Sequence, residues 1–275
     1  MTEDITRAVQ KQGLDILSKI DEVCTRHEIP YYLFYGTELG AVRHQGFIPW
    51  DDDIDIILYR KDFDRLKSVW QEEKPEGYFY QDYRTDPNYR LKITKIRKDH
   101  TALVETAFKD VDMHHGVWVD LFVLDDYVKN GFLRKISQLI FMFDSNAVRN
   151  HKDVGIRGAL YGVTNRIFKN GKIFQWWFEK IFPKLKKDET MCCDLTNFTF
   201  SFDGEFKREW FGKGKRVPFE GKLFPIPENS HETLRVSYGD YQKLPPEEQR
   251  ISQHNPYYYS TRNDYHPGMD IGGSE

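Results

Sequence analysis

The sequence predicts an α/β (α+β) fold in which a β-sheet is flanked by helices, with an added basic helical region. Strand-like runs alternate with helical runs along the first half of the chain, as is typical of this class. The run Gly116–Asp125 is almost wholly apolar and indicates a central strand buried on both faces. With 275 residues the chain can bury a sizeable core in one elaborated domain, or in a domain with an insertion.

Residues 3–28 have the pattern of an amphipathic helix. Apolar residues recur at spacings of three and four, and Pro30 prevents the helix from continuing. A first strand is expected over Tyr31–Tyr35, followed by a short helix over Thr37–His44. The apolar positions of the first helix are Ile5, Val9, Ile16, Leu17, Ile20, Val23 and Cys24.

Asp53 and Asp55 share one face of a strand predicted over Asp53–Leu58. Side chains alternate between the two faces of a strand, so the intervening Ile54 points to the other side. Two ionised carboxylates at that separation repel each other unless one is protonated or a cation lies between them. Oxygen-only ligands favour Mg²⁺ or Mn²⁺ over zinc, so the sequence predicts a divalent-metal site here.

The residues of this acidic stretch allow two other interpretations to be considered. The run 51–53 could be a solvated loop that precedes a strand. An EF-hand-like calcium loop that starts at Asp51 fails, because its sixth residue would be Ile56 where Gly is needed and its twelfth Asp62 where Glu is needed.

Gly36 and Thr37 lie where the first predicted strand passes into a helix. A glycine at such a position lets a phosphate approach the backbone, and the amide groups at the start of a helix favour an anion. We therefore expect these two residues to contact a substrate phosphate. Arg43, near the end of the same helix, is a further candidate for a phosphate contact, although a surface salt bridge explains it equally well.

A helix over 61–71 is expected before an alternating strand over Tyr89–Arg97. One face of that strand is mostly apolar but carries Lys95 and Arg97. Burial of a lysine without an anionic partner is costly, so Lys95 is a candidate for contact with a donor phosphate, with Arg97 behind it. The alternative is that both residues are exposed at the end of the strand. Thr101–Glu105 is expected to be a short hairpin partner.

Asp120 interrupts the apolar run of the predicted central strand. An unpaired carboxylate in a buried strand is unfavourable unless it binds a cation or a hydrogen-bond donor. Asp120 is therefore the candidate third metal ligand, beside Asp53 and Asp55.

The region 131–190 changes character, because helical segments rich in Phe and Trp alternate with basic residues. It contains 12 Lys and Arg against 5 Asp and Glu, in a chain with a net charge of −3. A basic, aromatic helical region can contact an anionic membrane surface or a phosphorylated glycolipid. The competing interpretation is a helical cap that packs on the sheet and exposes its lysines to solvent.

The C-terminal part is predicted to contain a hairpin and a short helix. The hairpin covers Arg216–Phe224 with its turn at Glu220-Gly221, and the helix runs from Asn229 to Tyr238. Residues 1–256 are expected to form one domain that includes 131–190. The residues 257–275 lack periodicity and are expected to be a flexible tail.

The order strand, Gly-Thr, helix and strand with Asp-x-Asp resembles the nucleotidyltransferase fold, which has a mixed sheet. The string GTELGAVRHQGFIPWDDDIDI, which starts at Gly36, resembles the LicD family of phosphotransferases, which includes phosphocholine transferases and the fukutin-related proteins. The resemblance extends to the stretch around Asp120 and to FPIPENSHETLRVSYGDYQKLPPEEQR near the C-terminus, so it covers most of residues 14–254.

The resemblance implies a metal-dependent transfer of a phospho-alcohol group, phosphocholine first, from a CDP-linked donor such as CDP-choline. The acceptor would be a sugar hydroxyl of a cell-surface glycan or glycolipid precursor, such as lipopolysaccharide, teichoic acid or capsule. Asp53, Asp55 and Asp120 would be the catalytic residues, with Mg²⁺ or Mn²⁺ as cofactor. The alternatives are a nucleotidyltransferase that moves a nucleoside monophosphate to a small molecule, and a non-catalytic binding protein on the same fold.

Composition limits the classes of partner and location. The net charge of −3 and a pI of about 6.3 provide no argument for nucleic acid binding. The start of the chain lacks the pattern of a secretory signal, and no apolar run reaches the length of a membrane span. Three cysteines without disulfide or zinc spacing favour a reduced compartment. We therefore expect a cytoplasmic protein, with 131–190 as the candidate for peripheral contact with the inner face of the membrane.

Overall fold

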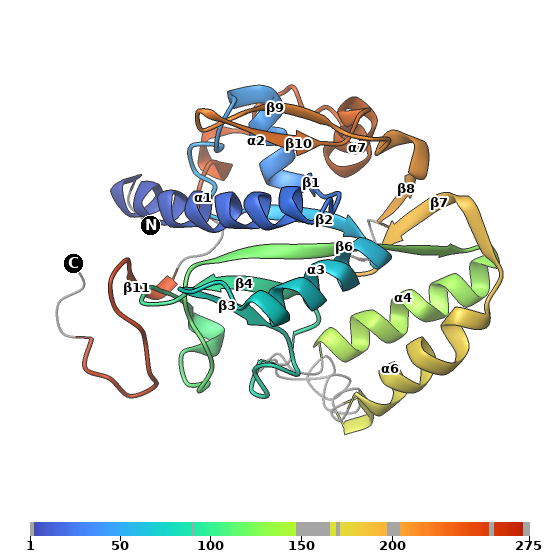
Figure 1. Cartoon of the computed structure of the whole chain (residues 1–275), viewed down its shortest axis with the longest axis horizontal. Helices are drawn as coiled ribbons and strands as arrows, with labels where there is room; N and C mark the ends of the chain where they lie inside the picture. Colours follow the sequence, from blue (N-terminus) through green and yellow to red (C-terminus); the bar gives the residue numbers. More distant parts are fainter. Residues whose placement is uncertain are drawn as a thin grey trace.

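The computed structural model describes residues 3–89, 91–146, 166–168, 171–196, 204–252 and 256–271. Within these residues the chain has the predicted α/β fold, with a sheet that contains both parallel and antiparallel strand pairs (Figure 1). The main sheet has the strand order β1-β2-β6-β4-β3, and β7 pairs with β6 and with β8. Strand β6 therefore lies at the centre of the sheet.

The bounds of the elements agree with most of the sequence-based expectations. The strands are β1 Tyr32–Leu33, β2 Asp55–Tyr59, β3 Tyr78–Gln81, β4 Thr94–Lys98, β5 Ala102–Glu105, β6 Trp118–Val128, β7 Lys187–Asp194, β8 Glu205–Lys207, β9 Lys215–Phe219, β10 Lys222–Ile226 and β11 Pro256–Ser260. The helices are α1 Glu3–Arg26, α2 Tyr35–His44, α3 Arg60–Glu73, α4 Gly131–Asn146, α6 Lys172–Trp176 and α7 Ser230–Tyr238. The predicted first helix, the 61–71 helix, the hairpin and the C-terminal helix are thus confirmed.

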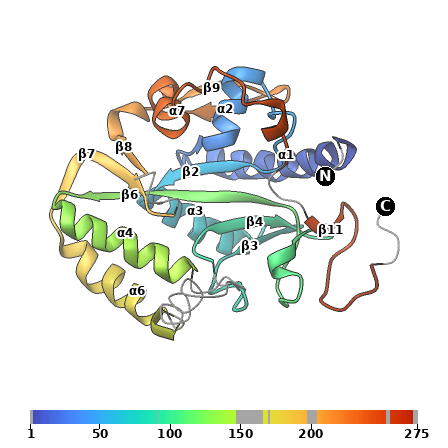
Figure 2. The ribbon, with the colours of Figure 1, turned by 180° about the vertical axis from the view of Figure 1, so that it is seen from behind.

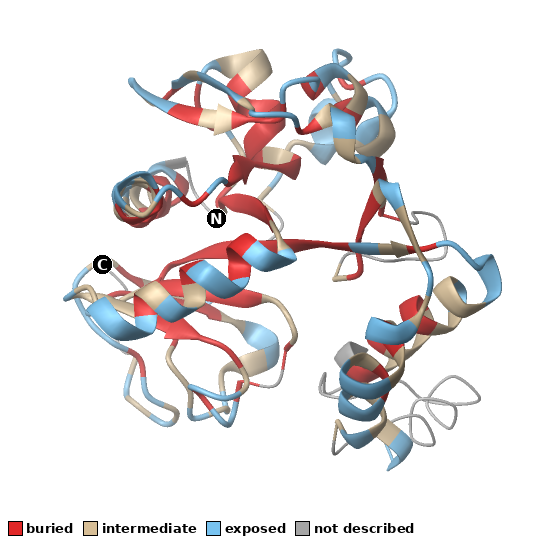
Figure 3. Cartoon of the chain, turned by 45° about the vertical axis from the view of Figure 1, so that its right-hand side comes forward, coloured by how far each residue is buried: buried red, intermediate tan, exposed pale blue. Residues whose placement is uncertain are grey.

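Helices α1 and α3 cover one face of the sheet (Figure 1). The apolar stripe of α1 supplies Ile16, Leu17 and Ile20, each with no exposed surface, to the main hydrophobic core. On the opposite face, seen in Figure 2, a second cluster packs aromatic rings on β2 and β6. The buried residues concentrate in this central sheet (Figure 3). One face is therefore covered by helices, and the other carries this aromatic cluster together with the polar residues described below.

The first strand and the basic strand are shorter than predicted. β1 ends at Leu33 and α2 begins at Tyr35, because the amide of Glu38 already donates to the carbonyl of Phe34 at 3.0 Å. The strand predicted over Tyr89–Arg97 begins only at Thr94. In both places the sequence pattern from which the strand was predicted is longer than the segment that pairs with a neighbouring strand.

The expected pairing of Thr101–Glu105 with the preceding strand is wrong. Its counterpart β5 instead pairs in antiparallel fashion with β11, which comes from the end of the chain. The expectation of a flexible tail is also wrong for 257–271, the part of 257–275 that the structure describes, because β11 and the buried Tyr265 lie there. The hydroxyl of Tyr265 donates to the carbonyl of Lys109 at 2.8 Å, so apolar burial and a hydrogen bond hold this segment on the domain.

The region 131–190 is helical where the structure describes it, and it ends in the first residues of β7. Helices α4 and α6 pack through Phe141 and Phe174 at the far end of β6, with their outer sides exposed (Figure 3). The centre of the region, 147–165, lies outside the described residues. Among the helices that are described, each is too short or too polar to cross a lipid bilayer. Peripheral membrane contact of 131–190 stays a prediction.

Candidate active site

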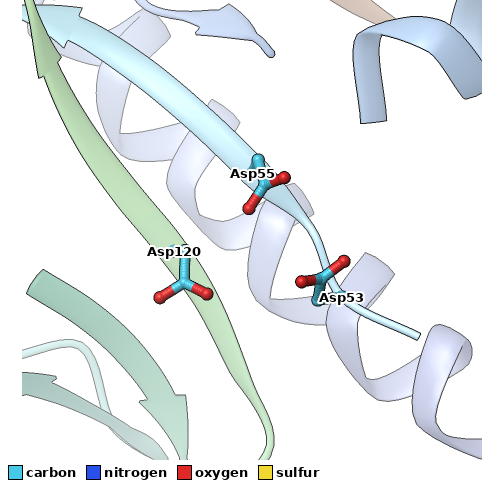
Figure 4. A group of neighbouring side chains, drawn as sticks. All are labelled: Asp53, Asp55 and Asp120. Carbon is cyan, nitrogen blue, oxygen red and sulfur yellow. The ribbon is translucent and has the colours of Figure 1, made fainter. Parts of the chain in front are cut away.

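Three carboxylates meet at the junction of β2 and β6, as the sequence predicted (Figure 4). Asp55 is the first residue of β2, Asp120 lies near the start of β6, and Asp53 lies just before β2. One oxygen of each lies within 4.8 Å of an oxygen of the other two. Asp55 is 9% exposed and Asp120 is 6% exposed, so two of the three are buried carboxylates.

The strand register brings two of these carboxylates and a lysine into one row across the sheet. In the parallel pair β2–β6, Asp55 is the partner of Asp120. In the antiparallel pair β4–β6, Lys95 is the partner of the same Asp120. The amide of Asp120 donates to the carbonyl of Ile54 at 2.8 Å, which keeps the two acidic strands in register. Partner residues point to the same face, so the three side chains share one space.

The predicted strand Asp53–Leu58 starts two residues late, so Asp53 is not part of it. The argument that strand alternation puts Asp53 and Asp55 on one face is therefore not the reason for their proximity. Asp53 reaches the cluster from the connection that leads into β2 (Figure 4). The grouping was correctly predicted, but the cause is the path of this connection.

Burial raises the pKa of Asp55 well above its ordinary value, and the charges of Asp53, Asp120 and Asp51 raise it further. The positive charge of Lys95 lowers the pKa of Asp55, but less than burial and the neighbouring carboxylates raise it. A divalent cation would relieve both the desolvation and the mutual repulsion. Three convergent carboxylate oxygens are the donor set that Mg²⁺ or Mn²⁺ prefers, so the residues fit the predicted metal.

Both oxygens of Asp120 accept hydrogen bonds from neighbouring side chains. The ammonium of Lys95 donates to Oδ1 at 2.6 Å, and the indole Nε1–H of Trp118 donates to Oδ2 at 2.8 Å. The ammonium also lies 4.1 Å from the centre of the Trp118 ring. Sequence reasoning missed Trp118, although its position two residues before Asp120 on a strand indicates the same face.

Lys95 and Arg97 are both buried, so the alternative that they are exposed at a strand end is wrong. Lys95 already has Asp120 as its anionic partner. Arg97 donates to Gln81 and, at 2.6 Å, to the carbonyl of Gly116, and its guanidinium lies over the Trp118 ring. Arg97 thus supports the indole that holds Asp120, and its direct contact with a substrate stays a prediction.

Gly36 and Thr37 lie inside the first turn of α2 and not before it. The hydroxyl of Thr37 accepts the amide hydrogen of Asp55 at 2.8 Å, which anchors the first residue of β2. A Cβ on Gly36 would lie only 2.7 Å from Oδ2 of Asp51, so glycine permits the close approach of the acidic connection to α2. Both residues therefore position the cluster, and their contact with a phosphate stays a prediction.

Arg43 lies at the far end of α2, and the structure does not bring it into the carboxylate cluster. Its guanidinium donates to the carbonyl of Tyr241 at 2.9 Å, beyond the end of α7. Burial lowers its pKa from the ordinary value. Its predicted phosphate contact stays untested.

The end of α7 was not predicted to belong to the site. The hydroxyl of Thr233 donates to the buried Glu38 at 2.6 Å, which holds α7 against α2. Although 44% of Tyr238 is exposed, desolvation raises the pKa of its phenol, and the charges of Asp55, Asp51 and Asp53 raise it further. Tyr238 and Asp51 line one pocket, which no local sequence pattern indicated.

Comparison with known proteins agrees with this geometry. A family model described as the nucleotidyltransferase domain of LicD, FKTN and FKRP matches residues 28–142, which include all three carboxylates. The lipopolysaccharide cholinephosphotransferase LicD of Haemophilus influenzae is 29% identical over 260 residues, which cover 90% of this chain and 95% of that protein. An uncharacterized protein of Rickettsia prowazekii is 40% identical over 94 residues, or 33% of this chain and 35% of that protein.

Proposed function

We propose that the chain is a phosphotransferase of the LicD family that transfers phosphocholine from CDP-choline to a sugar hydroxyl of a cell-surface glycan or glycolipid precursor. The Haemophilus influenzae relative, named a lipopolysaccharide cholinephosphotransferase, matches along nearly its whole length and supports the transferred group and the class of acceptor. The observation that carries the proposal is the convergence of Asp53, Asp55 and Asp120 at one face of the sheet.

Asp53, Asp55 and Asp120 would hold Mg²⁺ or Mn²⁺. When bound, the ion supplies positive charge to the diphosphate oxygens and to the leaving nucleotide. The protein itself has mainly to align the donor and the acceptor, because phosphoryl transfer needs little covalent chemistry from side chains. The paired strands β2 and β6 are a rigid support for that alignment.

Lys95 would supply a second, fixed positive charge. Its ammonium has three hydrogens to donate, of which one is directed at Asp120. A phosphate bound beside Asp120 comes within reach of the same ammonium. Trp118 holds the other oxygen of Asp120, so the carboxylate keeps its orientation while Lys95 turns part of its donor capacity to the substrate.

The test is transfer by the purified chain from labelled CDP-choline to lipopolysaccharide that lacks phosphocholine. We expect phosphocholine on the acceptor and CMP in solution, in Mg²⁺ or Mn²⁺ but not in EDTA, and loss of both products in Asp53→Asn. Asp110→Asn changes an exposed aspartate outside the carboxylate cluster, so it is the matched control and should remain active. CDP-ribitol and CDP-glycerol run in parallel identify the transferred alcohol.

Two results would contradict the proposal. Release of pyrophosphate from CTP with phosphocholine, without any transfer from CDP-choline, would show a nucleotidyltransferase. Equal activity of wild type and Asp53→Asn would remove the carboxylate cluster from the mechanism.

A further inference from the structure

We propose that a pocket beside the carboxylate cluster, walled by Trp50, Tyr238 and Tyr241, binds the trimethylammonium group of the donor. The proposal rests on the proposed function, since that function supplies a choline-bearing substrate. The proposal goes further by naming the residues that would recognise the choline group of the donor.

The pocket has a volume of about 610 Å³. It lies between α2, the connection that leads into β2, the end of α7 and the segment that follows α7 as far as Ile251. Helices α2 and α7 lie side by side above the sheet (Figures 1 and 2). Residues distant in sequence therefore build it, which explains why no single motif revealed it.

The pocket adjoins the connection that leads into the carboxylate cluster. Gly36 and Asp51 form one part of its wall, and Asp51 lies two positions before the cluster residue Asp53. Tyr238 forms another part of the wall, and the charges of Asp55, Asp51 and Asp53 raise the pKa of its phenol. With the phosphate at the cluster, the choline substituent would lie in this neighbouring pocket.

The wall has the chemistry that a quaternary ammonium needs. Such a group has no N–H to donate, so it is held by the faces of aromatic rings and by nearby negative charge. Three rings, those of Trp50, Tyr238 and Tyr241, and two carboxylates, Asp51 and Asp240, line the pocket. Tyr241 is positioned by His231, whose Nδ1 lies 3.1 Å from the phenol oxygen.

Two cations, Arg43 and Lys243, also line this space, and a third, Arg250, lies beside the Trp50 ring. Arg43 donates to the carbonyl of Tyr241 at 2.9 Å. Arg250 donates to the carbonyl of Pro245 at 2.9 Å and lies 5.8 Å from the centre of the Trp50 ring, so this ring already has a cation near it. Lys243 is exposed to solvent. The charges of the lining therefore do not exclude a further cation next to Asp51 and Asp240.

The nucleobase of the donor is the rival occupant, because a flat ring also stacks on aromatic side chains. The alcohol is favoured by its position, since it is bonded directly to the phosphorus that is transferred. It is also favoured by the carboxylate of Asp51, which attracts a full positive charge more strongly than the uncharged amino group of a cytosine from which it could also accept a hydrogen bond.

The test compares the binding of phosphocholine with that of 3,3-dimethylbutyl phosphate, which has the same shape without the positive charge. We expect wild type to bind phosphocholine roughly tenfold more tightly in calorimetric titrations with Mg²⁺, as a desolvated cation–π site allows. Trp50→Leu and Tyr238→Leu should each bring the ratio of the two affinities towards one. Tyr257→Leu, a similarly exposed tyrosine on β11, is the matched control and should keep the wild-type ratio.

The proposal is overturned if wild type binds both phosphates equally or binds neither. It is also overturned if both pocket variants keep the full ratio, or if they weaken CMP binding and leave phosphocholine binding unchanged, because the pocket would then hold the base. The transfer assay separates this proposal from the function. If the chain prefers phosphocholine over 3,3-dimethylbutyl phosphate but transfers nothing, the pocket proposal holds and the proposed function is wrong. If it transfers phosphocholine without that preference in binding, the function holds and the pocket proposal is wrong.

Discussion

Asp120 and Asp125 are two buried aspartates on the same strand, and they have opposite surroundings. Asp125 accepts two hydrogen bonds from the guanidinium of Arg60, both at 2.8 Å, so its charge is matched by a bidentate partner. Asp120 shares a single ammonium with a group of carboxylates that together carry excess negative charge. A buried carboxylate with a complete partner stabilises the fold, whereas one in an incompletely neutralised group is arranged for a cation.

A substitution at Asp120 tests the contrast between the two aspartates most directly. Asp120→Asn should lower transfer by about a thousandfold or more, because it removes a metal ligand and a charge that orients Lys95. The fold should persist with a modest loss of stability. The amide oxygen can still accept from Lys95 and the change relieves repulsion within the cluster, but the amide NH2 cannot accept the hydrogen bond that Trp118 now donates. Initial rates and thermal unfolding of the same preparation test this, and a rate within tenfold of wild type would contradict it.

Asp125→Asn should show the converse behaviour. The free energy of unfolding should fall by about 2 kcal/mol, because Arg60 loses a charged, bidentate partner at a buried carboxylate. Activity per folded molecule should stay close to that of wild type. Urea unfolding measures the first quantity and active-site-normalised rates the second. Loss of activity without loss of stability would mean that Asp125 takes part in the reaction.

The pH dependence of the free energy of unfolding tests the incomplete neutralisation of the carboxylate cluster, and its expected effect is smaller than those of the two substitutions. In the unfolded chain Asp55 ionises near ~3.9, whereas the fold raises its pKa. Above pH ~3.9 the unfolded state loses its proton while the folded state retains it, so the contribution of Asp55 to stability falls as pH rises towards the folded pKa.

The change should be at most about 1.4 kcal/mol per pH unit for this one proton. Asp194, whose pKa burial raises to about 6, contributes with the same sign, so the measurement is the difference between wild type and Asp55→Asn in EDTA. In EDTA that difference should grow with pH, whereas saturating Mg²⁺ should remove this growth, because a bound cation favours the ionised form of Asp55 in the folded state. A difference independent of pH would contradict the raised pKa.

Much of the fold could be predicted because its signals are local. The stripe of α1, the turn of the β9–β10 hairpin and the apolar run of β6 each lie within one element. The pairing of β5 with β11 could not be predicted, since it joins residues about 150 positions apart and the C-terminal partner has no periodic pattern. The same limit hid the contact of α7 with α2 through Thr233 and Glu38.

The sequence by itself determined the chemistry of the site. The carboxylates Asp53, Asp55 and Asp120 could be predicted as metal ligands because their spacing and the apolar residues around them are visible in the sequence. Only the tertiary structure decided that the β2–β6–β4 register places Asp55, Asp120 and Lys95 in one row, and that Tyr238 lines a pocket together with Asp51. Register and distant contacts depend on which apolar faces pack together, and that choice belongs to the whole core and to no single segment.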